Sequence, residues 1–291
     1  MSNPEGTLSW QDLVREATAR LTEALGGARQ QEARWIVERI SGYSSGELVV
    51  KSGELVGGRS VARFDQLIAR RCAGEPLQYV LGQWAFRSLE LIVDRRVLIP
   101  RPETEMVAGL AIDVLRTRRT PLAADLGTGS GAIALSIANE VAEATIHATD
   151  VSSDALAVAR ANLTGLGRAA RRVTMHVGSW YSALPPSLAG RLDLIISNPP
   201  YVAASDELPP DVAEWEPRLA LIGPGSGGEE FVSHLIDHAP EWLVPDGVLI
   251  IEMQPNQTET ARLRALKVGF IRAQIIRDFA DKPRALVAHQ A

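Results

Sequence analysis

From about residue 121 onward, short apolar runs alternate with segments of helical periodicity. Strands are predicted at 121–126, 145–150, 172–178, 192–197, 247–253, 271–277 and 284–289. Helices are predicted at about 130–140, 152–164, 228–243 and 257–267. Such alternation predicts an α/β fold, because neighbouring parallel strands need a helical crossover between them. The short Asp278–Pro283 connection adds an antiparallel hairpin at one edge of a seven-stranded, mostly parallel sheet.

Before this alternation, residues 8–73 have the pattern of a small helical bundle. Apolar residues recur at helical spacing in three stretches, which end near residues 25, 41 and 73, and glycines follow each of them. Ser9 and Asp12 form a candidate capping box for the first helix. A short hairpin and a linker follow, and Pro102 opens a helix that runs to about Arg116. We therefore expect a helical domain at 1–74, a hairpin and linker at 75–102, and an α/β domain at 103–291.

The composition of the chain limits the cellular compartment and the kind of binding partner that can be expected. A formal net charge of −5 and a pI near 5.6 argue against a general nucleic-acid-binding surface. The single cysteine, Cys72, excludes an intramolecular disulfide and fits a reducing cytosol. No signal peptide and no apolar run of membrane-spanning length is evident, so a cytoplasmic location is expected. His234 and His238 have no third ligand nearby in sequence, so no metal site is expected.

The stretch Leu192–Tyr201 places a distinctive group at the end of a buried strand. Asn198 follows the apolar run, and Pro199 and Pro200 then stop the strand and stiffen the chain. An asparagine oxygen beside a proline carbonyl provides two acceptors that can grip both hydrogens of a planar –NH2 group, with the Tyr201 ring beside them. Gripping the hydrogens would turn the nitrogen lone pair toward an electrophile. The alternative interpretation is a strand that simply ends in a common turn opening.

A glycine-rich loop follows the first predicted strand of the α/β domain. Its glycines at 127, 129 and 131 lack the Lys-Ser/Thr of a phosphate loop and the spacing of a dinucleotide fingerprint. The second strand ends at Asp150, whose carboxylate can hold ribose hydroxyls. The third leads to Trp180, whose ring can stack on adenine. These successive strand ends suit a ligand that contains adenosine but no pyrophosphate.

Together these motifs resemble an S-adenosylmethionine-dependent methyltransferase. The resemblance is closest to the bacterial peptide-chain-release-factor glutamine methyltransferases (PrmC/HemK), and it covers roughly residues 75 to 290. It is carried by Asp125–Leu135, Asp150, Gly178–Trp180 and Ser197–Tyr201, and by Gly74–Gly82, Leu98–Glu105 and Glu216–Leu221. A Rossmann-like methyltransferase sheet with a small N-terminal helical domain is the arrangement that this family implies.

The resemblance also implies roles for individual residues. Residues that would contact S-adenosyl-L-methionine are Gly127, Thr128, Gly129, Ser130, Gly131, Asp150, Trp180 and Asn198. Residues that would hold the substrate amide, and serve catalysis, are Asn198, Pro199, Pro200 and Tyr201. The implied reaction is N-methylation of a protein glutamine, that of the Gly-Gly-Gln motif in class 1 release factors. The helical domain would recognise the protein substrate, and a monomer is favoured.

Two alternative functions stay open, and two segments of the chain differ from the sequence pattern of the family. The Asn-Pro-Pro-Tyr motif is shared with methyltransferases that act on adenine amines of DNA or RNA, and an inactive cofactor-binding scaffold is a further alternative. Where the family has a compact Gly-Gly-x-Asp-Gly-Leu, this chain has Ile222–Glu230. Where the family has Glu-x-Gly, this chain has Glu252–Pro255. Both departures fall near the expected cleft, so a shifted protein substrate is conceivable.

Overall fold

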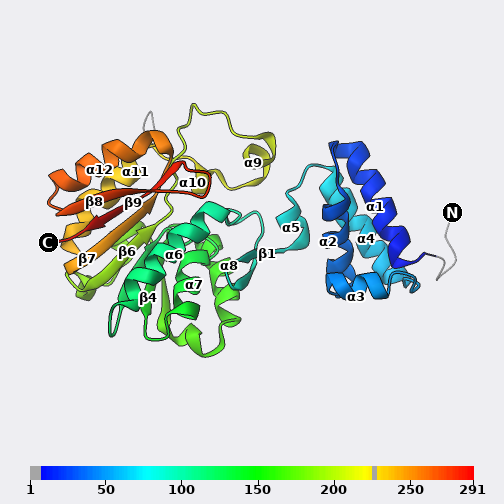
Figure 1. Cartoon of the computed structure of the whole chain (residues 1–291), viewed down its shortest axis with the longest axis horizontal. Coiled ribbons are helices and arrows are strands. Elements are labelled where there is room, and N and C mark those ends of the chain that lie inside the picture. The colour runs from blue at the N-terminus through cyan, green and yellow to red at the C-terminus, as the bar shows by residue number, and fades with distance from the viewer. Residues whose placement is uncertain (1–7, 225–227) are drawn as a thin grey trace. The chain divides into compact units, whose positions relative to one another are not determined.

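The computed structural model describes residues 8–224 and 228–291, and the chain divides into two compact units (Figure 1). The smaller unit comprises the chain up to Gln83 together with Pro210–Trp215. The larger unit comprises Trp84–Pro209 and Glu216–Ala291. Among the helices of these described residues, none combines the length and the apolar character that a bilayer span requires.

The smaller unit is helical, as predicted. Its helices are α1 (Trp10–Leu25), α2 (Gln30–Ser41), α3 (Ser45–Val50), α4 (Gly58–Cys72), α5 (Leu77–Leu81) and α9 (Pro210–Trp215). The capping box of α1 is confirmed, since the Ser9 hydroxyl accepts from Asp12 N at 3.2 Å and Ser9 N donates to the Asp12 carboxylate at 2.9 Å. The sequence did not predict α3, α5 and α9, each of six residues or fewer, because they are too short for a helical repeat to show.

The larger unit is built on the predicted sheet, whose strand order is β5-β4-β3-β6-β7-β9-β8 (Figure 1). The strands are β3 (Leu122–Leu126), β4 (Thr145–Asp150), β5 (Val173–Val177), β6 (Leu192–Ser197), β7 (Leu243–Glu252), β8 (Arg272–Arg277) and β9 (Pro283–His289). Strands β3 to β7 are parallel, and β8 and β9 form the predicted antiparallel hairpin at one edge. A separate two-stranded hairpin, β1 (Gln83–Phe86) with β2 (Leu89–Ile92), confirms the short hairpin predicted before the linker.

Two predicted boundaries were wrong. The helix expected over 228–243 is α11 (Glu230–His238), followed by a 3₁₀ turn at Ala239–Glu241. Pro240 has no backbone N–H to continue the α-helical ladder, so the helix ends before it. Strand β7 begins at Leu243 rather than 247, because the positive φ of Asp246 (62°) allows a register irregularity through which the strand extends.

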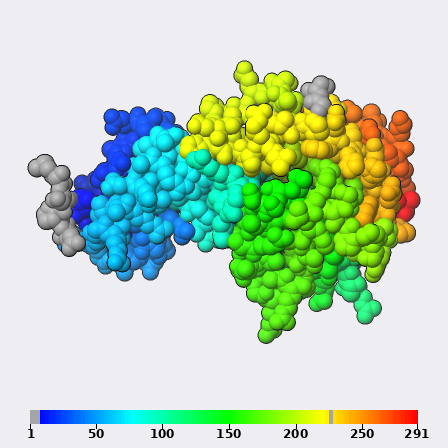
Figure 2. Space-filling view, turned by 180° about the vertical axis from the view of Figure 1, so that it is seen from behind, coloured from blue at the N-terminus to red at the C-terminus, as the bar shows by residue number. Residues whose placement is uncertain are grey.

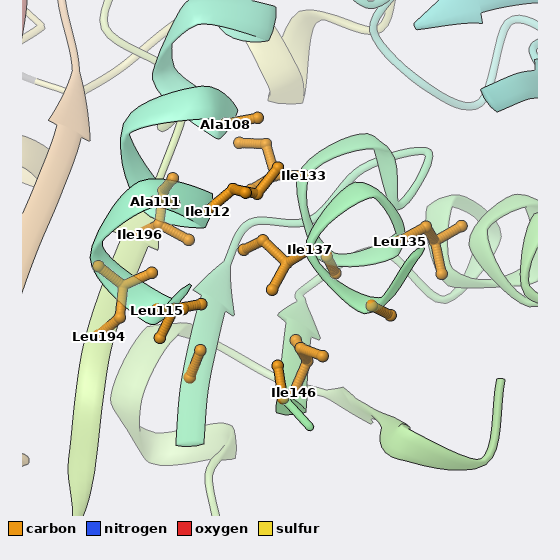
Figure 3. Close-up of a cluster of buried hydrophobic side chains, with 14 of the residues drawn as sticks. Ala108, Ala111, Ile112, Leu115, Ile133, Leu135, Ile137, Ile146, Leu194 and Ile196 are labelled. Atoms are coloured by element: carbon orange, nitrogen blue, oxygen red, sulfur yellow. The ribbon is translucent and has the colours of Figure 1, made fainter. Parts of the chain in front are cut away.

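Five of the remaining helices cover the two faces of the sheet. On one face, α6 (Pro102–Arg116), α7 (Ala132–Glu140) and α8 (Ser153–Thr164) lie over β3 to β6, and on the other lie α11 and α12 (Thr258–Lys267). Figure 3 shows Ala111 and Leu115 of α6 facing Leu194 and Ile196 of β6, while Ile112 points the other way, toward α7. The close packing of these fully buried side chains holds the ends of β3 and β6 in place.

We expect Leu194→Ala to lower the free energy of unfolding by about 2–5 kcal/mol, because it leaves a cavity in this core. Denaturant titration of the purified protein measures the loss. Leu263→Ala is the matched control, since the Leu263 side chain is 54% exposed on α12 while Leu194 is fully buried. Equal effects of the two substitutions would contradict the core assignment.

Candidate functional site

The site lies where the strand order of the sheet reverses. From β3 the chain proceeds outward to β4 and β5, and then returns to place β6 on the other side of β3. The loops after β3 and β6 therefore open a crevice at the carboxyl ends of the strands, the usual ligand position in such sheets. A pocket of about 270 Å³ occupies this crevice. In Figure 2 the part of the chain after residue 228 (yellow to orange) adjoins the part from about residue 125 to 200 (green), and both parts supply residues that line the pocket.

The glycine-rich loop forms the floor of the pocket. Gly127, Gly129 and Gly131 all have positive φ, at 79°, 55° and 86°. The N–H groups of Gly127 and Thr128 both donate to the Thr149 carbonyl at 2.9 Å, which folds the loop back over β4. A Cβ atom on Gly127 would lie 3.2 Å from the Trp180 ring, so only glycine lets that ring lie so close to the loop.

Asp150 at the end of β4 shapes the loop and faces the pocket. One carboxylate oxygen accepts from Gly129 N at 2.9 Å and the other from Ser152 N at 2.9 Å. Burial raises the pKa of Asp150 above its usual range, and these two backbone N–H groups oppose that shift. Each oxygen keeps a lone pair, so the carboxylate can also accept from a pair of neighbouring hydroxyl groups on a bound ligand.

Two aromatic rings form one wall. Trp180 is half-buried and follows Gly178, whose φ is 149°. Its ring packs edge-to-face against Phe231 of α11, with ring centroids 5.1 Å apart and an interplanar angle of 61°. Phe231 was not predicted, and nothing in its local sequence marks it, because it reaches the pocket only through the packing of α11.

Asn198 is held in a defined orientation at the end of β6. Its Nδ2 donates to the Thr104 hydroxyl of α6 at 3.2 Å. Because the amide nitrogen is engaged there, the Oδ1 atom is the part of this side chain left to accept from a ligand in the pocket that Asn198 lines. Thr104 also lines the pocket and was not assigned a role from the sequence.

The two prolines after Asn198 differ in their surroundings. The Pro200 carbonyl oxygen lies only 2.5 Å from where a Cβ on Gly223 would stand, so this carbonyl faces the neighbouring backbone. Pro199 is buried, and within the described part of the chain no backbone or side-chain donor pairs with its carbonyl. Pro200 lines the pocket and Pro199 does not, and in the described part of the chain neither carbonyl is paired with a donor, so a second acceptor beside Asn198 can come from either proline.

Tyr201 is not among the residues that line the pocket. Its hydroxyl donates to Glu252 Oε1 at 3.3 Å, and its carbonyl accepts from Gln257 Nε2 at 3.0 Å. Burial raises the pKa of Glu252 to about 7, against the opposing effects of the Thr104 hydroxyl and Arg284. Tyr201 was expected beside the substrate amide, and its hydroxyl lies on this buried carboxylate.

The divergent segment after Leu221 packs against the Pro-Pro-Tyr backbone. Gly223 N donates to the Val202 carbonyl at 3.0 Å, and a Cβ on Gly228 would overlap the Tyr201 carbonyl. Glycine at both positions permits this approach. The residues between them that depart from the family pattern, Gly225–Gly227, lie outside the described residues.

Glu216 connects two of the motifs that carry the family resemblance. Its buried carboxylate accepts from Ile99 N at 3.0 Å and pairs with Arg101. This contact holds the Leu98–Glu105 segment, whose Leu98, Pro100 and Arg101 line the pocket. The side chain of Arg101 is 33% exposed, so its charge is neutralised on one side and open to a ligand on the other.

The structure brings most of the predicted residues into one pocket. Those that line it are Gly127, Thr128, Gly129, Ser130, Asp150, Trp180, Asn198 and Pro200. Gly131, Pro199 and Tyr201 support it without lining it. His234 and His238 are exposed on α11, and the described residues contain no cluster of three or more metal-ligating side chains.

The pocket fits an adenosine-containing sulfonium cofactor. Gly129 has open space where a side chain would stand, Asp150 offers two acceptors, and Trp180 provides a ring face or edge. With S-adenosyl-L-methionine in this position, the glycine loop would cradle the ligand backbone and Asp150 would hold the ribose.

We expect Asp150→Ala to weaken binding of S-adenosyl-L-methionine by roughly 10- to 100-fold, because acceptors worth about 1.5–3 kcal/mol are lost. Isothermal titration calorimetry measures the affinity, and far-UV circular dichroism checks the fold. Asp154→Ala, at an exposed position on α8, is the matched control. Unchanged affinity in Asp150→Ala would remove the ribose assignment.

Two stretches of the chain match models of known protein families. Residues 12–82 match the PrmC N-terminal domain and residues 105–214 match the methyltransferase small domain. A methyltransferase structure from Pyrococcus furiosus superposes with a TM-score of 0.50 at 18% identity, covering 80% of this chain and 98% of that one. The hMettl16 catalytic domain in complex with the MAT2A 3′UTR hairpin 1 gives 0.55 at 14% identity, covering 82% and 83%. These structural likenesses support the fold alone.

Curated relatives are similar over nearly the whole chain. Release factor glutamine methyltransferase of Deinococcus radiodurans is 35% identical, over 96% of this chain and 98% of its own length. That of Bordetella pertussis is 39% identical over 89% and 94%, and that of Streptomyces coelicolor 36% over 96% and 99%. Identity at this level across both units leaves one conclusion, that the chain belongs to the release factor glutamine methyltransferase family.

Proposed function

We propose that this protein uses S-adenosyl-L-methionine to methylate the side-chain nitrogen of a glutamine, that of the Gly-Gly-Gln motif in class 1 release factors. The observation that carries the proposal is the orientation of Asn198. Its Nδ2 is engaged by Thr104, so Oδ1 is left to accept from an –NH2 group in the pocket. The names of the curated relatives support the same acceptor.

The proposed chemistry depends on positioning. When bound, the cofactor supplies a methyl group that its sulfonium already activates. Asn198 Oδ1 and the carbonyl of Pro199 or Pro200 accept the two hydrogens of the glutamine amide, which fixes the amide plane and directs the nitrogen for in-line attack. The fixed acceptors also stabilise the positive charge that develops on that nitrogen, which then loses a proton to water.

The two alternatives receive less support. Methylation of adenine amines would need a nucleic-acid surface, and the net charge of −5 opposes one. The fold-level likeness to an RNA-bound methyltransferase domain rests on 14% identity and carries no substrate. An inactive scaffold would have no need for the Thr104 contact that orients Asn198.

We further propose that residues 1–74 recognise the protein substrate, that 75–102 link the parts, and that 103–291 carry the chemistry. All residues that line the pocket lie beyond residue 74. The helical unit exposes three apolar side chains that are close in the sequence, Val49 (60%), Val50 (85%) and Leu55 (64%), which suit contact with another protein. A class 1 release factor as substrate is consistent with the cytoplasmic location and the monomeric state predicted from the sequence.

We expect Asn198→Ala to lower the rate of methyl transfer to a release factor by about 10²- to 10³-fold, because one of two acceptors is lost. Single-turnover transfer from radiolabelled cofactor measures the chemical step. Asn139→Ala, at an exposed asparagine of α7, is the control. The same assay with DNA and RNA tests the alternative acceptors, and label on nucleic acid but not on the factor would refute the proposal.

We expect Val50→Asp to raise KM for the intact release factor at least several-fold, because a charge replaces an apolar contact. Turnover of a short Gly-Gly-Gln peptide and affinity for the cofactor should not change. Leu263→Asp is the control, since Leu263 is also an exposed apolar residue, in the larger unit. An unaltered KM for the intact factor would argue against recognition through this patch.

A further inference from the structure

Asn162 of α8 is a buried polar side chain whose amide is engaged by backbone groups of two distant segments. It is 6% exposed, and Asn162 Oδ1 accepts from Ile92 N at 2.7 Å. Asn162 Nδ2 donates to the Ile92 carbonyl at 3.1 Å and to the Ser130 carbonyl at 2.9 Å. The amide nitrogen has two hydrogens, so each carbonyl receives one of them. The side chain therefore joins the end of β2 to the glycine-rich loop.

The two segments that Asn162 joins both contribute to the pocket. Ser130 belongs to the loop that forms the floor, and it lines the pocket itself. Ile92 ends β2, and the chain that follows it supplies Val97 and Leu98 to the lining. Asn162 is 70 residues from Ile92 and 32 from Ser130 along the chain, so the packing of α8 brings the three together.

The peptide group between Ser130 and Gly131 is held at both of its polar atoms. Its carbonyl accepts from Asn162, and its N–H donates to the Thr128 carbonyl at 2.8 Å. Gly131 has a φ of 86°, and a Cβ atom there would lie 3.4 Å from the Ala159 Cβ, so α8 packs directly against the loop. Rotation of this peptide group would break both hydrogen bonds. The loop therefore depends on α8 for the conformation in which it lines the pocket.

We propose that Asn162 is a positioning residue for the cofactor, which holds the glycine-rich loop and the segment after β2 at the spacing that S-adenosyl-L-methionine requires. The inference rests on the proposed function only in its use of this cofactor. Asn162 does not line the pocket, so its effect reaches the ligand through the backbone groups that it binds. Loss of these contacts should weaken cofactor binding and leave the chemical step nearly unchanged.

The first test is Asn162→Asp, which keeps the shape of the side chain and the acceptor for Ile92 N but replaces the donor with an oxygen. We expect its affinity for S-adenosyl-L-methionine to fall by about 10- to 100-fold at about pH 8, because a carboxylate oxygen then faces two carbonyls. Isothermal titration calorimetry measures this affinity. Single-turnover methyl transfer at saturating cofactor should stay within about threefold of wild type.

Lowering the pH should partly restore this variant. Burial raises the pKa of a carboxyl group and favours its protonated form, which has one hydrogen to donate to a carbonyl. Relative to wild type at the same pH, Asn162→Asp should therefore bind the cofactor better at about pH 6 than at about pH 8. Asn162→Ala has no donor at either pH, so its loss relative to wild type should be the same at both.

Asn139→Asp is the matched control. Asn139 Nδ2 donates to the Ser88 hydroxyl at 3.1 Å, so this side chain also connects a helix to the β1–β2 hairpin, but it does not line the pocket. We expect its affinity for the cofactor to match wild type at both pH values. An affinity of Asn162→Asp within about threefold of wild type at about pH 8 would overturn the inference. An equal loss in Asn139→Asp would count equally against it.

A measurement on the wild-type protein needs neither a variant nor an acceptor. Hydrogen exchange of the Asn162 side-chain amide, followed by NMR in ¹⁵N-labelled full-length protein, should slow when S-adenosyl-L-methionine is added, because the ligand and Asn162 hold the same loop. The exposed Asn139 amide is the internal reference, and its exchange should not change. Equal exchange of the Asn162 amide with and without cofactor would refute the inference. If the wild type binds the cofactor but methylates no release factor, the proposed function fails, and these exchange rates still decide the role of Asn162.

Discussion

The parallel pairing of β3 with β6 is the contact on which the site depends. The Ser197 hydroxyl donates to the Leu126 carbonyl at 2.6 Å. This hydrogen bond holds the last residue of β6 beside the last residue of β3. The glycine loop and Asn198 therefore leave the sheet at the same edge. After β3 the chain continues to β4 on one side, and after β6 it continues to β7 on the other side. The connections therefore diverge at the carboxyl ends of β3 and β6, and a crevice remains between them.

Around this crevice, backbone segments approach one another more closely than side chains would allow. Gly127 makes room for the Trp180 ring, and Gly223 and Gly228 bring the segment after Leu221 against the Pro200–Val202 backbone. Two buried carboxylates, Glu216 and Glu252, carry a desolvation cost at the same place. Glu216 accepts from Ile99 N and pairs with Arg101, and Glu252 accepts from the Tyr201 hydroxyl, so each carboxylate joins segments that are far apart in the sequence.

Much of the larger unit was predictable because its pattern is local and repeated. Buried parallel strands read as apolar runs, and their ends are marked by Gly127, Asp150 and Asn198, so β4 and β6 were placed at their observed bounds. The prediction failed where a local signal was short or absent. Helices α3, α5 and α10 (Arg218–Leu221) span six residues or fewer, and Pro240 divides what reads as one helix.

The sequence by itself determined the residue types at the strand ends, and with them the chemistry of the pocket. Only the tertiary structure decided which groups stand behind them. Thr104 meets Asn198 across 94 residues of chain, and Tyr201 meets Glu252 across 51. Such meetings depend on strand order, on register and on the packing of α6 against β6. Those are properties of the whole core, because no local preference of either residue selects its partner.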